Sequence, residues 1–111
     1  FVLKELLDMV TGHGVTSEVV RSLGGAARSD MWLQMKADVL GTPVERPICS
    51  DAASLGAAML AAYGTGAFNS LREASESWYK PGIVCTPDNA RTAVYKAVYK
   101  RYLAVRNRLY G

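Results

Sequence analysis

The residues best placed to hold a ligand are two adjacent glycines, Gly24 and Gly25. They stand between a short apolar segment and the start of an amphipathic one, and Arg28 and Ser29 follow closely. Because glycine has no side chain, another molecule can come close to the backbone at such a turn. Bare backbone and small side chains beside a helix N-terminus can accommodate a flat base and its sugar. The pattern therefore raises the hypothesis of a nucleotide site.

The glycine turn has other interpretations. A tight connection between a strand and a helix can require glycine for its backbone geometry alone. A dinucleotide-binding loop is disfavoured, because residues 24–29 lack the G-x-G-x-x-G spacing and no acidic residue ends a following strand at the expected distance. A Walker loop is disfavoured because no Gly-Lys-Ser/Thr follows. The residues around the turn leave the plain turn and the nucleotide site open.

The other reactive side chains show no catalytic or metal-binding spacing. His13 is the one histidine and lies between two glycines, which is typical of a solvated loop residue. Cys49 and Cys85 are far apart in sequence and have no metal-type spacing with that histidine. We expect reduced core thiols rather than a disulfide. No catalytic and no metal-binding residue is assigned to the chain.

Apolar periodicity predicts the elements that carry the turn. Helical spacing runs over residues 1–10, with Gly12 as the expected C-terminal cap. A short strand is expected within residues 18–23, leading into the glycine pair. Residues 42–48 are bracketed by prolines and predict a second short strand near a sheet edge.

The helix after the glycine pair is expected to begin at Ser29, a typical N-cap, and to end at Gly41. Its polar side chains Gln34, Lys36 and Asp38 are expected to point away from the core. The side predicted to face the core is apolar and consists of Met31, Trp32, Met35, Val39 and Leu40.

Three further helices are predicted in the second half of the chain. Each follows a good N-cap, namely Asp51, Ser70 and Asp88. They are expected to end near Tyr63, near Trp78 and close to the C-terminal residue. Gly56, inside the first of them, costs on the order of 1 kcal/mol relative to alanine. We therefore expect another element to press against that glycine.

These elements predict an α/β fold with an incomplete sheet covered by helices. Two strands are convincing, whereas residues 83–85 predict only a brief extended piece. Two strands make a poor sheet, so we expect the missing strands to precede Phe1.

Positive charge is concentrated towards the C-terminal residue. Residues 88–111 hold six Lys or Arg and one acid, giving +5, so the rest of the chain must carry −2 of the total +3. Tyrosines alternate with these cations, as in some nucleic-acid-binding segments. However, the tyrosines follow an apolar face, which consists of Val94, Val98, Tyr102, Val105 and Leu109. We expect core packing with a solvated basic face, and no nucleic-acid partner.

Three blocks of sequence resemble the C-terminal signature of the FGGY carbohydrate kinases. The first is Gly-Gly-Ala-Ala-Arg-Ser-Asp-Met-Trp at 24–32, followed by Ala-Asp-Val-Leu-Gly-Thr-Pro-Val at 37–44. The second is Asp51 with Leu-Gly-Ala-Ala at 55–58, and the third is Ala-Ala-Tyr-Gly-Thr-Gly at 61–66. Family members commonly show Gly-Gly-Gly-Ala-Lys-Ser-x-x-Trp, then Ala-Asp-Val-Leu-Gly-x-Pro-Val, then an acid and a Leu-Gly-Ala-Ala helix. The order and spacing of the blocks make the resemblance specific over about residues 19–87.

The resemblance implies that residues 1–111 are the C-terminal portion of an actin-like (ribonuclease-H-like), ATP-binding domain. Gly24, Gly25 and Ala26 match the loop whose backbone lies against the adenosine and the phosphates. Ser29 matches a position near the adenine. Arg28 stands where lysine is frequent and is expected to edge the nucleotide pocket.

Two residues depart from the family pattern. Ala26 replaces a third glycine and adds a methyl group where the backbone meets the ligand. Asp51 replaces the more usual glutamate and shortens that acid by a methylene. The family's amino-terminal Asp-x-Gly-Thr segment and its catalytic Asp match nothing in this chain. We therefore expect the isolated chain not to phosphorylate sugars.

The resemblance implies an ATP-dependent carbohydrate kinase of the cytoplasm, acting on a xylulose-like ketose, with Mg²⁺ held mainly by parts outside this chain. The alternative is a stand-alone small α/β module that binds or dimerises without catalysis. No apolar run approaches the roughly 20 residues of a membrane helix, so no membrane partner is expected. Exposed sheet edge and apolar surface lead us to expect a homo-oligomer.

Overall fold

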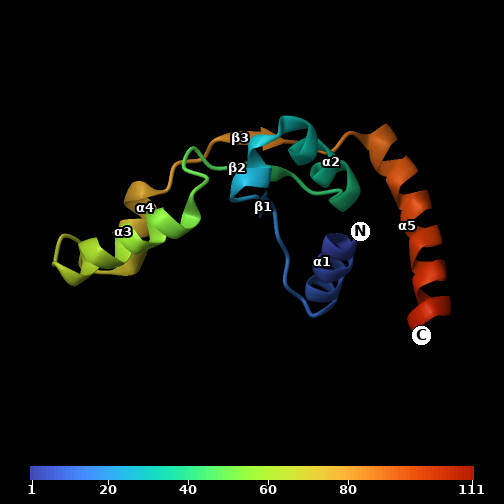
Figure 1. The fold of residues 1–111 in the computed structure, drawn as a ribbon, viewed down its shortest axis with the longest axis horizontal. Coiled ribbons are helices and arrows are strands. Elements are labelled where there is room, and N and C mark those ends of the chain that lie inside the picture. The colour runs from blue at the N-terminus through green and yellow to red at the C-terminus, as the bar shows by residue number, and fades with distance from the viewer.

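A computed structural model describes all residues, 1–111, as an elongated molecule with a small sheet at its middle (Figure 1). Two helices extend from one side of the sheet, and two more lie on the other side. The extents are 54 × 29 × 24 Å and the radius of gyration is 17.3 Å. A compact chain of this length would have a radius of gyration of about 13 Å. The chain thus does not gather around one central core.

The sequence-predicted helices are present, with an additional short 3₁₀-helix in the glycine turn. Helix bounds are α1 (Val2–Gly12), η1 (Gly25–Arg28), α2 (Asp30–Leu40), α3 (Ala52–Gly64), α4 (Leu71–Trp78) and α5 (Asn89–Tyr110). Strand bounds are β1 (Val20–Arg21), β2 (Val44–Arg46) and β3 (Ile83–Cys85). The expected N-caps are confirmed before α2, α3, α4 and α5. Helix α1 continues through Gly12, so His13 takes the C-cap position.

The sheet has the order β1-β2-β3, which corrects two expectations. The brief extended piece at residues 83–85 is a true third strand, antiparallel to β2, with Val44 opposite Cys85. Strand β2 is therefore central and not at an edge. Pro43 and Pro47 flank this three-residue strand and lie outside it, so neither removes a ladder hydrogen bond.

Strands β1 and β2 are parallel, with Val20 opposite Val44. The Val20 N–H also donates to the Pro43 carbonyl at 2.9 Å, which starts the pairing just before β2. Because the strands are parallel, the segments that leave their carboxyl ends emerge at the same edge of the sheet. One of these segments is the glycine turn, and the other leads into α3.

The core lies between α2 and the sheet. Its fully or nearly fully buried apolar members are Ala27, Leu33, Ala37, Leu40 and Val44. Only 11 of the 111 residues are buried, so this core is small for the chain. Burying each of the larger members contributes on the order of 1.5–3 kcal/mol.

The prediction of which side of α2 faces the core is wrong. The buried side is rotated about the helix axis relative to the predicted one. Of the five predicted residues only Leu40 is buried, whereas Met31 is 73% exposed and Trp32 is 42% exposed. The packed side carries Leu33, Ala37 and Leu40, spaced four and three residues apart, because this side meets the sheet. Asp38 was expected to point away from the core and is instead buried.

Helices α1 and α5 lie on the side of α2 away from α3. Both pack against α2, and the Phe1 ring lies 5.5 Å from the Tyr99 ring and 5.4 Å from the Tyr102 ring. Tyr99 and Tyr102 thus pack on Phe1 and not in the core, so the expected core packing of α5 is not found in this chain. The aliphatic residues of its predicted core face are exposed in this chain, namely Val94, Val98, Val105 and Leu109.

Helices α3 and α4 pair with each other at the opposite end of the molecule. The Phe68 and Trp78 rings meet edge to face at 5.2 Å. No side chain of α3 is buried, and nothing lies within 4 Å of the position that a Cβ atom would take at Gly56. No element of this chain takes the expected place beside that glycine.

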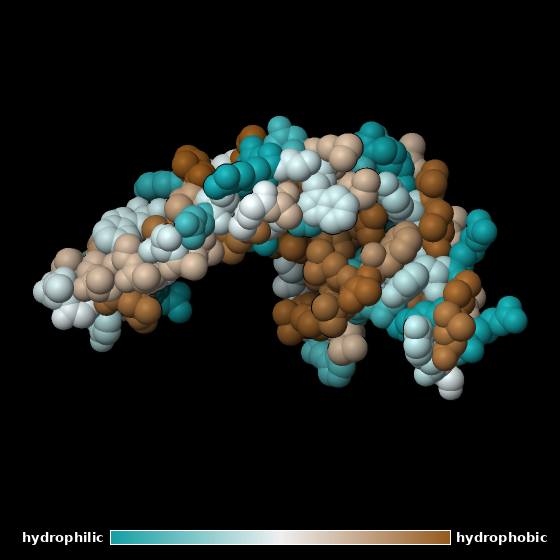
Figure 2. All heavy atoms as spheres, viewed as in Figure 1, coloured by the Kyte–Doolittle hydropathy of each residue, from teal (hydrophilic) through white to brown (hydrophobic).

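Apolar side chains are exposed over α1 and along α5, where brown atoms gather in Figure 2. None of the helices combines the length and the apolar character that crossing a bilayer requires. Both cysteines are free, and Cys49 is exposed, which corrects its expected place in the core.

Candidate nucleotide site

The two glycines of the turn have different structural roles. Gly24 has φ 81° and ψ −173°, a backbone conformation that is essentially restricted to glycine. Gly25 has no such conformation, and nothing lies within 4 Å of the position its Cβ atom would take. Gly24 is therefore required by the turn itself, as in the plain-turn interpretation. Gly25 keeps open space beside the backbone.

A hydrogen bond joins this turn to the segment before α3. The Gly24 N–H donates to the Ser50 carbonyl at 2.9 Å. The turn then closes as η1, in which the Ala27 N–H donates to the Gly24 carbonyl at 3.1 Å. Two segments that are about 25 residues apart in sequence are thereby held side by side at the edge of the sheet.

An open cavity of about 480 Å³ lies between these two segments. Ligand pockets in proteins typically have volumes of about 300–1,000 Å³. The lining residues come from the end of β1 through η1 and from the first turn of α3, namely Leu23, Gly24, Gly25, Arg28, Ser50, Asp51, Ala52 and Ala53. Small residues dominate this lining, which leaves the backbone accessible to a ligand.

Three of the five sequence-predicted site residues line this cavity: Gly24, Gly25 and Arg28. The other two are in the same turn but do not line it. The Ser29 Oγ accepts the Trp32 N–H at 3.3 Å and so caps α2. Ala26 lies in η1, where its carbonyl accepts the Ser29 N–H at 3.5 Å.

Sequence reasoning missed the second wall of the cavity. Ser50, Ala52 and Ala53 carry no chemical signal by themselves, and Asp51 was noted only as a cap and as a family position. The parallel pairing of β1 and β2 could have indicated this wall, because it brings both exit segments to one edge.

The cavity carries one cation and one carboxylate. The Asp51 carboxylate accepts the Ser54 N–H at 3.1 Å and the Ser54 hydroxyl at 2.9 Å. The backbone hydrogen bond, the hydroxyl hydrogen bond and the nearby charge of Arg28 lower the pKa of Asp51 below its ordinary value. The carboxylate is therefore ionised at neutral pH. Arg28 suits an anionic group such as phosphate, whereas Asp51 suits hydroxyl or amino donors.

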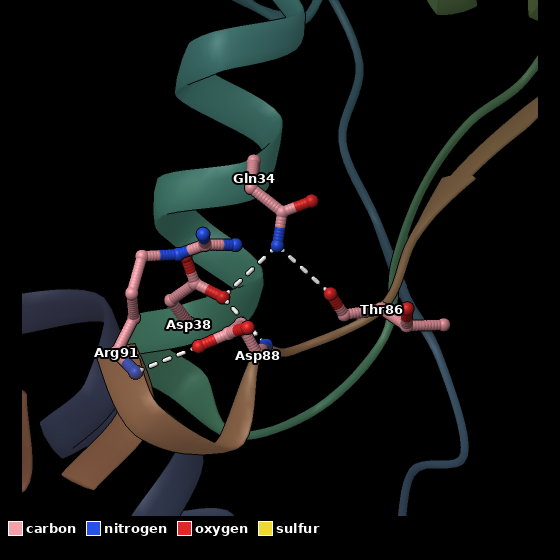
Figure 3. A network of polar contacts seen from close by, with 5 residues as sticks. All are labelled: Gln34, Asp38, Thr86, Asp88 and Arg91. Carbon is pink, nitrogen blue, oxygen red and sulfur yellow. Dashed lines mark hydrogen bonds and ion pairs between the residues drawn. The ribbon is translucent and has the colours of Figure 1, made fainter.

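Helix α2, which begins directly after the turn, is anchored by a polar network around Asp38 (Figure 3). The buried Asp38 carboxylate accepts the Asp88 N–H at 2.8 Å, the Arg91 Nε–H at 2.6 Å and the Gln34 amide at 2.9 Å. Gln34 also donates to the Thr86 carbonyl at 2.8 Å. These contacts fix the start of α5 against α2.

The charge of Asp38 is stabilised by this network. Burial alone would raise the pKa of its carboxyl group, but the hydrogen bonds from Arg91, Asp88 and Gln34 together lower that pKa below its ordinary value. Asp38 is 2% exposed and is thus an ionised group inside the core region. Its hydrogen bonds give it a structural role, since they join α2 to the start of α5.

The residues of this chain do not fit a metal ion. No three His, Cys, Asp or Glu side chains come together in an arrangement that could hold one. His13 lies outside the cavity, and its Nδ1 contacts the Met9 carbonyl at 2.8 Å. No step through a metal is derived from these residues.

The sequence is similar to curated sugar and polyol kinases. A xylulose kinase from Bacillus subtilis is 35% identical over 102 residues, which cover 92% of this chain and 20% of that protein. A glycerol kinase from Klebsiella pneumoniae is 34% identical over 110 residues, which cover 94% of this chain and 22% of that protein. The chain thus spans about a fifth of the length of the curated relatives that it matches.

The fold is also found in solved kinase structures. A xylulose kinase from Lactobacillus acidophilus aligns with a TM-score of 0.78 at 22% identity, over 97% of this chain and 22% of that one. A xylulose kinase from Rhodospirillum rubrum aligns with a TM-score of 0.71 at 26% identity, also over 97% of this chain and 22% of that one. The expected α/β class, as part of an actin-like (ribonuclease-H-like) domain, is confirmed.

A sequence model of the C-terminal domain of the FGGY family of carbohydrate kinases matches residues 1–65, more than half of the chain and including the whole cavity lining. This chain therefore belongs to the FGGY family of carbohydrate kinases.

Proposed function

We propose that this chain supplies the nucleotide-binding wall of an ATP-dependent carbohydrate kinase. The observation that carries the proposal is the cavity between the glycine turn and the first turn of α3, in a chain of the FGGY family. We further propose that residues 1–111 as a whole form the C-terminal portion of the nucleotide-binding domain, in a cytoplasmic enzyme.

Several features of the cavity support ATP as its ligand. The exposed backbone beside Gly25 and the small side chains of Ala52 and Ala53 leave room for a flat base and its sugar. Arg28 provides positive charge for the phosphates. In this proposal, Ala26 and Ser29 shape the turn from behind, since neither lines the cavity. Mg²⁺, which neutralises phosphate charge in phosphoryl transfer, would be held by groups outside this chain.

The proposed substrate is a xylulose-like ketose. The Arg28-Ser29-x-x-Trp32 pattern resembles the Lys-Ser-x-x-Trp pattern of xylulokinase-like family members. The matched relatives include both xylulose kinases and glycerol kinases at similar identity. The choice between a ketose and glycerol is therefore the sharpest test of the substrate.

The experiment is a substrate panel offered to the full-length protein that carries this chain. ADP formation would be followed with ATP, Mg²⁺ and, in turn, ketopentoses, aldoses and glycerol. We expect the highest kcat/KM with D-xylulose. Preference for glycerol would contradict the proposed substrate, and absence of ADP formation with every acceptor would contradict the kinase.

A pair of glycine variants tests the site in the same assay. Gly25→Leu places a side chain in the cavity lining, and we expect the KM for ATP to rise by roughly tenfold or more, as when binding loses about 1.4 kcal/mol. Gly12→Leu is the matched control, because Gly12 also has open space at its Cβ position but lies at the end of α1. An unchanged KM for ATP in Gly25→Leu would contradict the assigned site.

Self-association is a second candidate role, favoured by the exposed apolar side chains of α1 and α5. Such surface usually marks an interface. The 111-residue chain alone is expected to form oligomers in sedimentation velocity and to show no turnover of D-xylulose and ATP. A monodisperse monomer would contradict the first expectation, and turnover would contradict the second.

A further inference from the structure

The arginine that ends β2 contacts the glycine turn from outside the cavity. The Arg46 Nη1 donates to the Ala27 carbonyl at 3.0 Å and to the Arg28 carbonyl at 3.0 Å. The same nitrogen lies 2.9 Å from Asp30 Oδ1. The Arg46 side chain is only 19% exposed and does not line the cavity. One guanidinium thus holds the last two carbonyls of η1 and the first residue of α2.

The turn depends on such outside contacts because its own hydrogen bonds are few. Short 3₁₀-helices have poor hydrogen-bond geometry, and the Ser29 N–H reaches the Ala26 carbonyl only at 3.5 Å. The carbonyls at a helix end have no partner within the helix. An arginine side chain can donate hydrogen bonds to these carbonyls, and its positive charge interacts favourably with the negative end of the helix dipole. Arg46 does both for η1.

Fixing these carbonyls fixes the residue that carries the charge of the cavity. The Ala27 side chain is fully buried in the core, so this residue is held from one side by packing and from the other by Arg46. Arg28 follows directly, with its carbonyl on Arg46 and its side chain at the cavity. The direction in which Arg28 leaves the backbone is therefore set by Arg46.

The opposite face of β2 provides a comparison. Successive side chains of a strand point to opposite faces. Glu45 accepts the Tyr79 hydroxyl at 2.5 Å and lies 3.6 Å from Arg21. The Arg21 guanidinium lies 4.3 Å from the Tyr79 ring centroid and donates to its hydroxyl. Arg21 thus lies on the neighbouring strand β1 and contacts the side chains of Glu45 and Tyr79, not the glycine turn.

We propose that Arg46 is a positioning residue for nucleotide binding, which holds η1 so that Gly24, Gly25 and Arg28 face the ligand. The inference rests on the proposed function and adds to it a residue that lies behind the cavity. A lysine at this position would keep the charge, but its nitrogen stands one bond nearer the backbone than Nη1, the atom that makes all three contacts of Arg46. Nucleotide affinity is therefore expected to follow the guanidinium and not the charge alone.

The test compares Arg46→Met, Arg46→Lys and the control Arg21→Met in the full-length protein that carries this chain. The readouts are the KM for ATP, the KM for the sugar, the dissociation constant for ATP and the thermal unfolding temperature. We expect Arg46→Met to raise the KM and the dissociation constant for ATP by roughly tenfold, the scale of a lost charged hydrogen bond. Arg46→Lys should raise both by about threefold. The KM for the sugar should stay within about twofold, as should all three constants in Arg21→Met.

Specific outcomes would overturn the inference. One is a folded Arg46→Met protein with wild-type ATP affinity, and another is an equal rise of the ATP and sugar constants, which is the mark of general damage. If Arg46→Met does not fold, Arg46→Lys decides: unchanged ATP affinity contradicts the role. Wild-type protein that binds no ATP would overturn the proposed function and this inference together, whereas the other outcomes leave the proposed function intact.

Discussion

Helices α2 and α3 each begin at one wall of the cavity, yet they differ in how the chain supports them. Helix α2 has a mixed sequence and buries four residues: Leu33, Ala37, Asp38 and Leu40. Helix α3 consists almost entirely of alanine and other apolar residues and buries none. Composition alone therefore does not decide burial in this chain. What decides it is position, because α2 lies on the sheet and α3 extends away from it (Figure 1).

This difference has a consequence for the cavity. The wall formed by η1 and α2 is fixed within the chain by the core, by the Asp38 network and by Arg46. The wall formed by the first turn of α3 is fixed mainly through the hydrogen bond from Gly24 to Ser50 and the cap at Asp51. Substitutions in α2 should therefore be costly in this chain, and comparable substitutions in α3 should not.

The largest effect is expected for Leu33→Ala. Leu33 is fully buried in α2, and truncation of a buried leucine costs about 2–5 kcal/mol of unfolding free energy. We expect about 3 kcal/mol in denaturant unfolding of the 111-residue chain. A loss below about 1 kcal/mol would mean that the packed side of α2 has been misplaced.

A smaller loss is expected for Asp38→Asn. The asparagine amide removes the negative charge that Arg91 contacts, and its NH₂ group cannot accept a hydrogen bond as a carboxylate oxygen does. We expect this to cost about 2 kcal/mol of unfolding free energy. The matched control is Asp8→Asn, since Asp8 forms an exposed pair with Lys4 one helical turn away. This control should change the unfolding free energy by less than about 0.5 kcal/mol. Equal losses in the two variants would contradict the special role of the Asp38 network.

The Asp38 network also predicts a dependence of stability on pH. Because the pKa of Asp38 is lower in the folded than in the unfolded chain, its contribution is present above the unfolded value of about 3.9. The contribution is lost as the pH falls through the lower folded value. Wild-type stability should therefore drop more steeply than that of Asp38→Asn as the pH falls below about 4. Parallel unfolding curves for the two proteins would contradict this.

The smallest effect is expected for Leu60→Ala in α3. Leu60 is 59% exposed, and substitutions of exposed residues usually change stability by less than about 0.5 kcal/mol. The same denaturant measurement on the 111-residue chain checks this, with Leu33→Ala as its counterpart. A loss as large as that of Leu33→Ala would show that α3 is packed as tightly as α2 and would remove the difference between the helices.

Much of the fold could be predicted from signals within short stretches of sequence. The residues Ser29, Asp51, Ser70 and Asp88 were predicted as N-caps, and each accepts a backbone N–H in the first turn of its helix. Capping depends on residues three positions apart, so it can be predicted from a short stretch of sequence. The left-handed Gly41 at the end of α2 is another example.

Features that depend on distant partners were not predictable in this way. Which side of α2 is buried depends on where the sheet lies, and periodicity alone favoured the wrong side. The burial of Asp38 depends on Arg91, which is 53 residues away. The same holds for the site: Gly24, Gly25 and Arg28 have a local pattern, whereas the second wall at residues 50–53 follows from strand pairing.

The most direct test of the account is hydrogen exchange of the full-length protein with and without ATP. Backbone amides in residues 23–28 and 50–53 form the two walls of the cavity. We predict that ATP slows exchange in both segments and leaves exchange in the second half of α5 unchanged. Unchanged exchange in both segments, at an ATP concentration that saturates turnover, would contradict the assignment of this cavity as the nucleotide site.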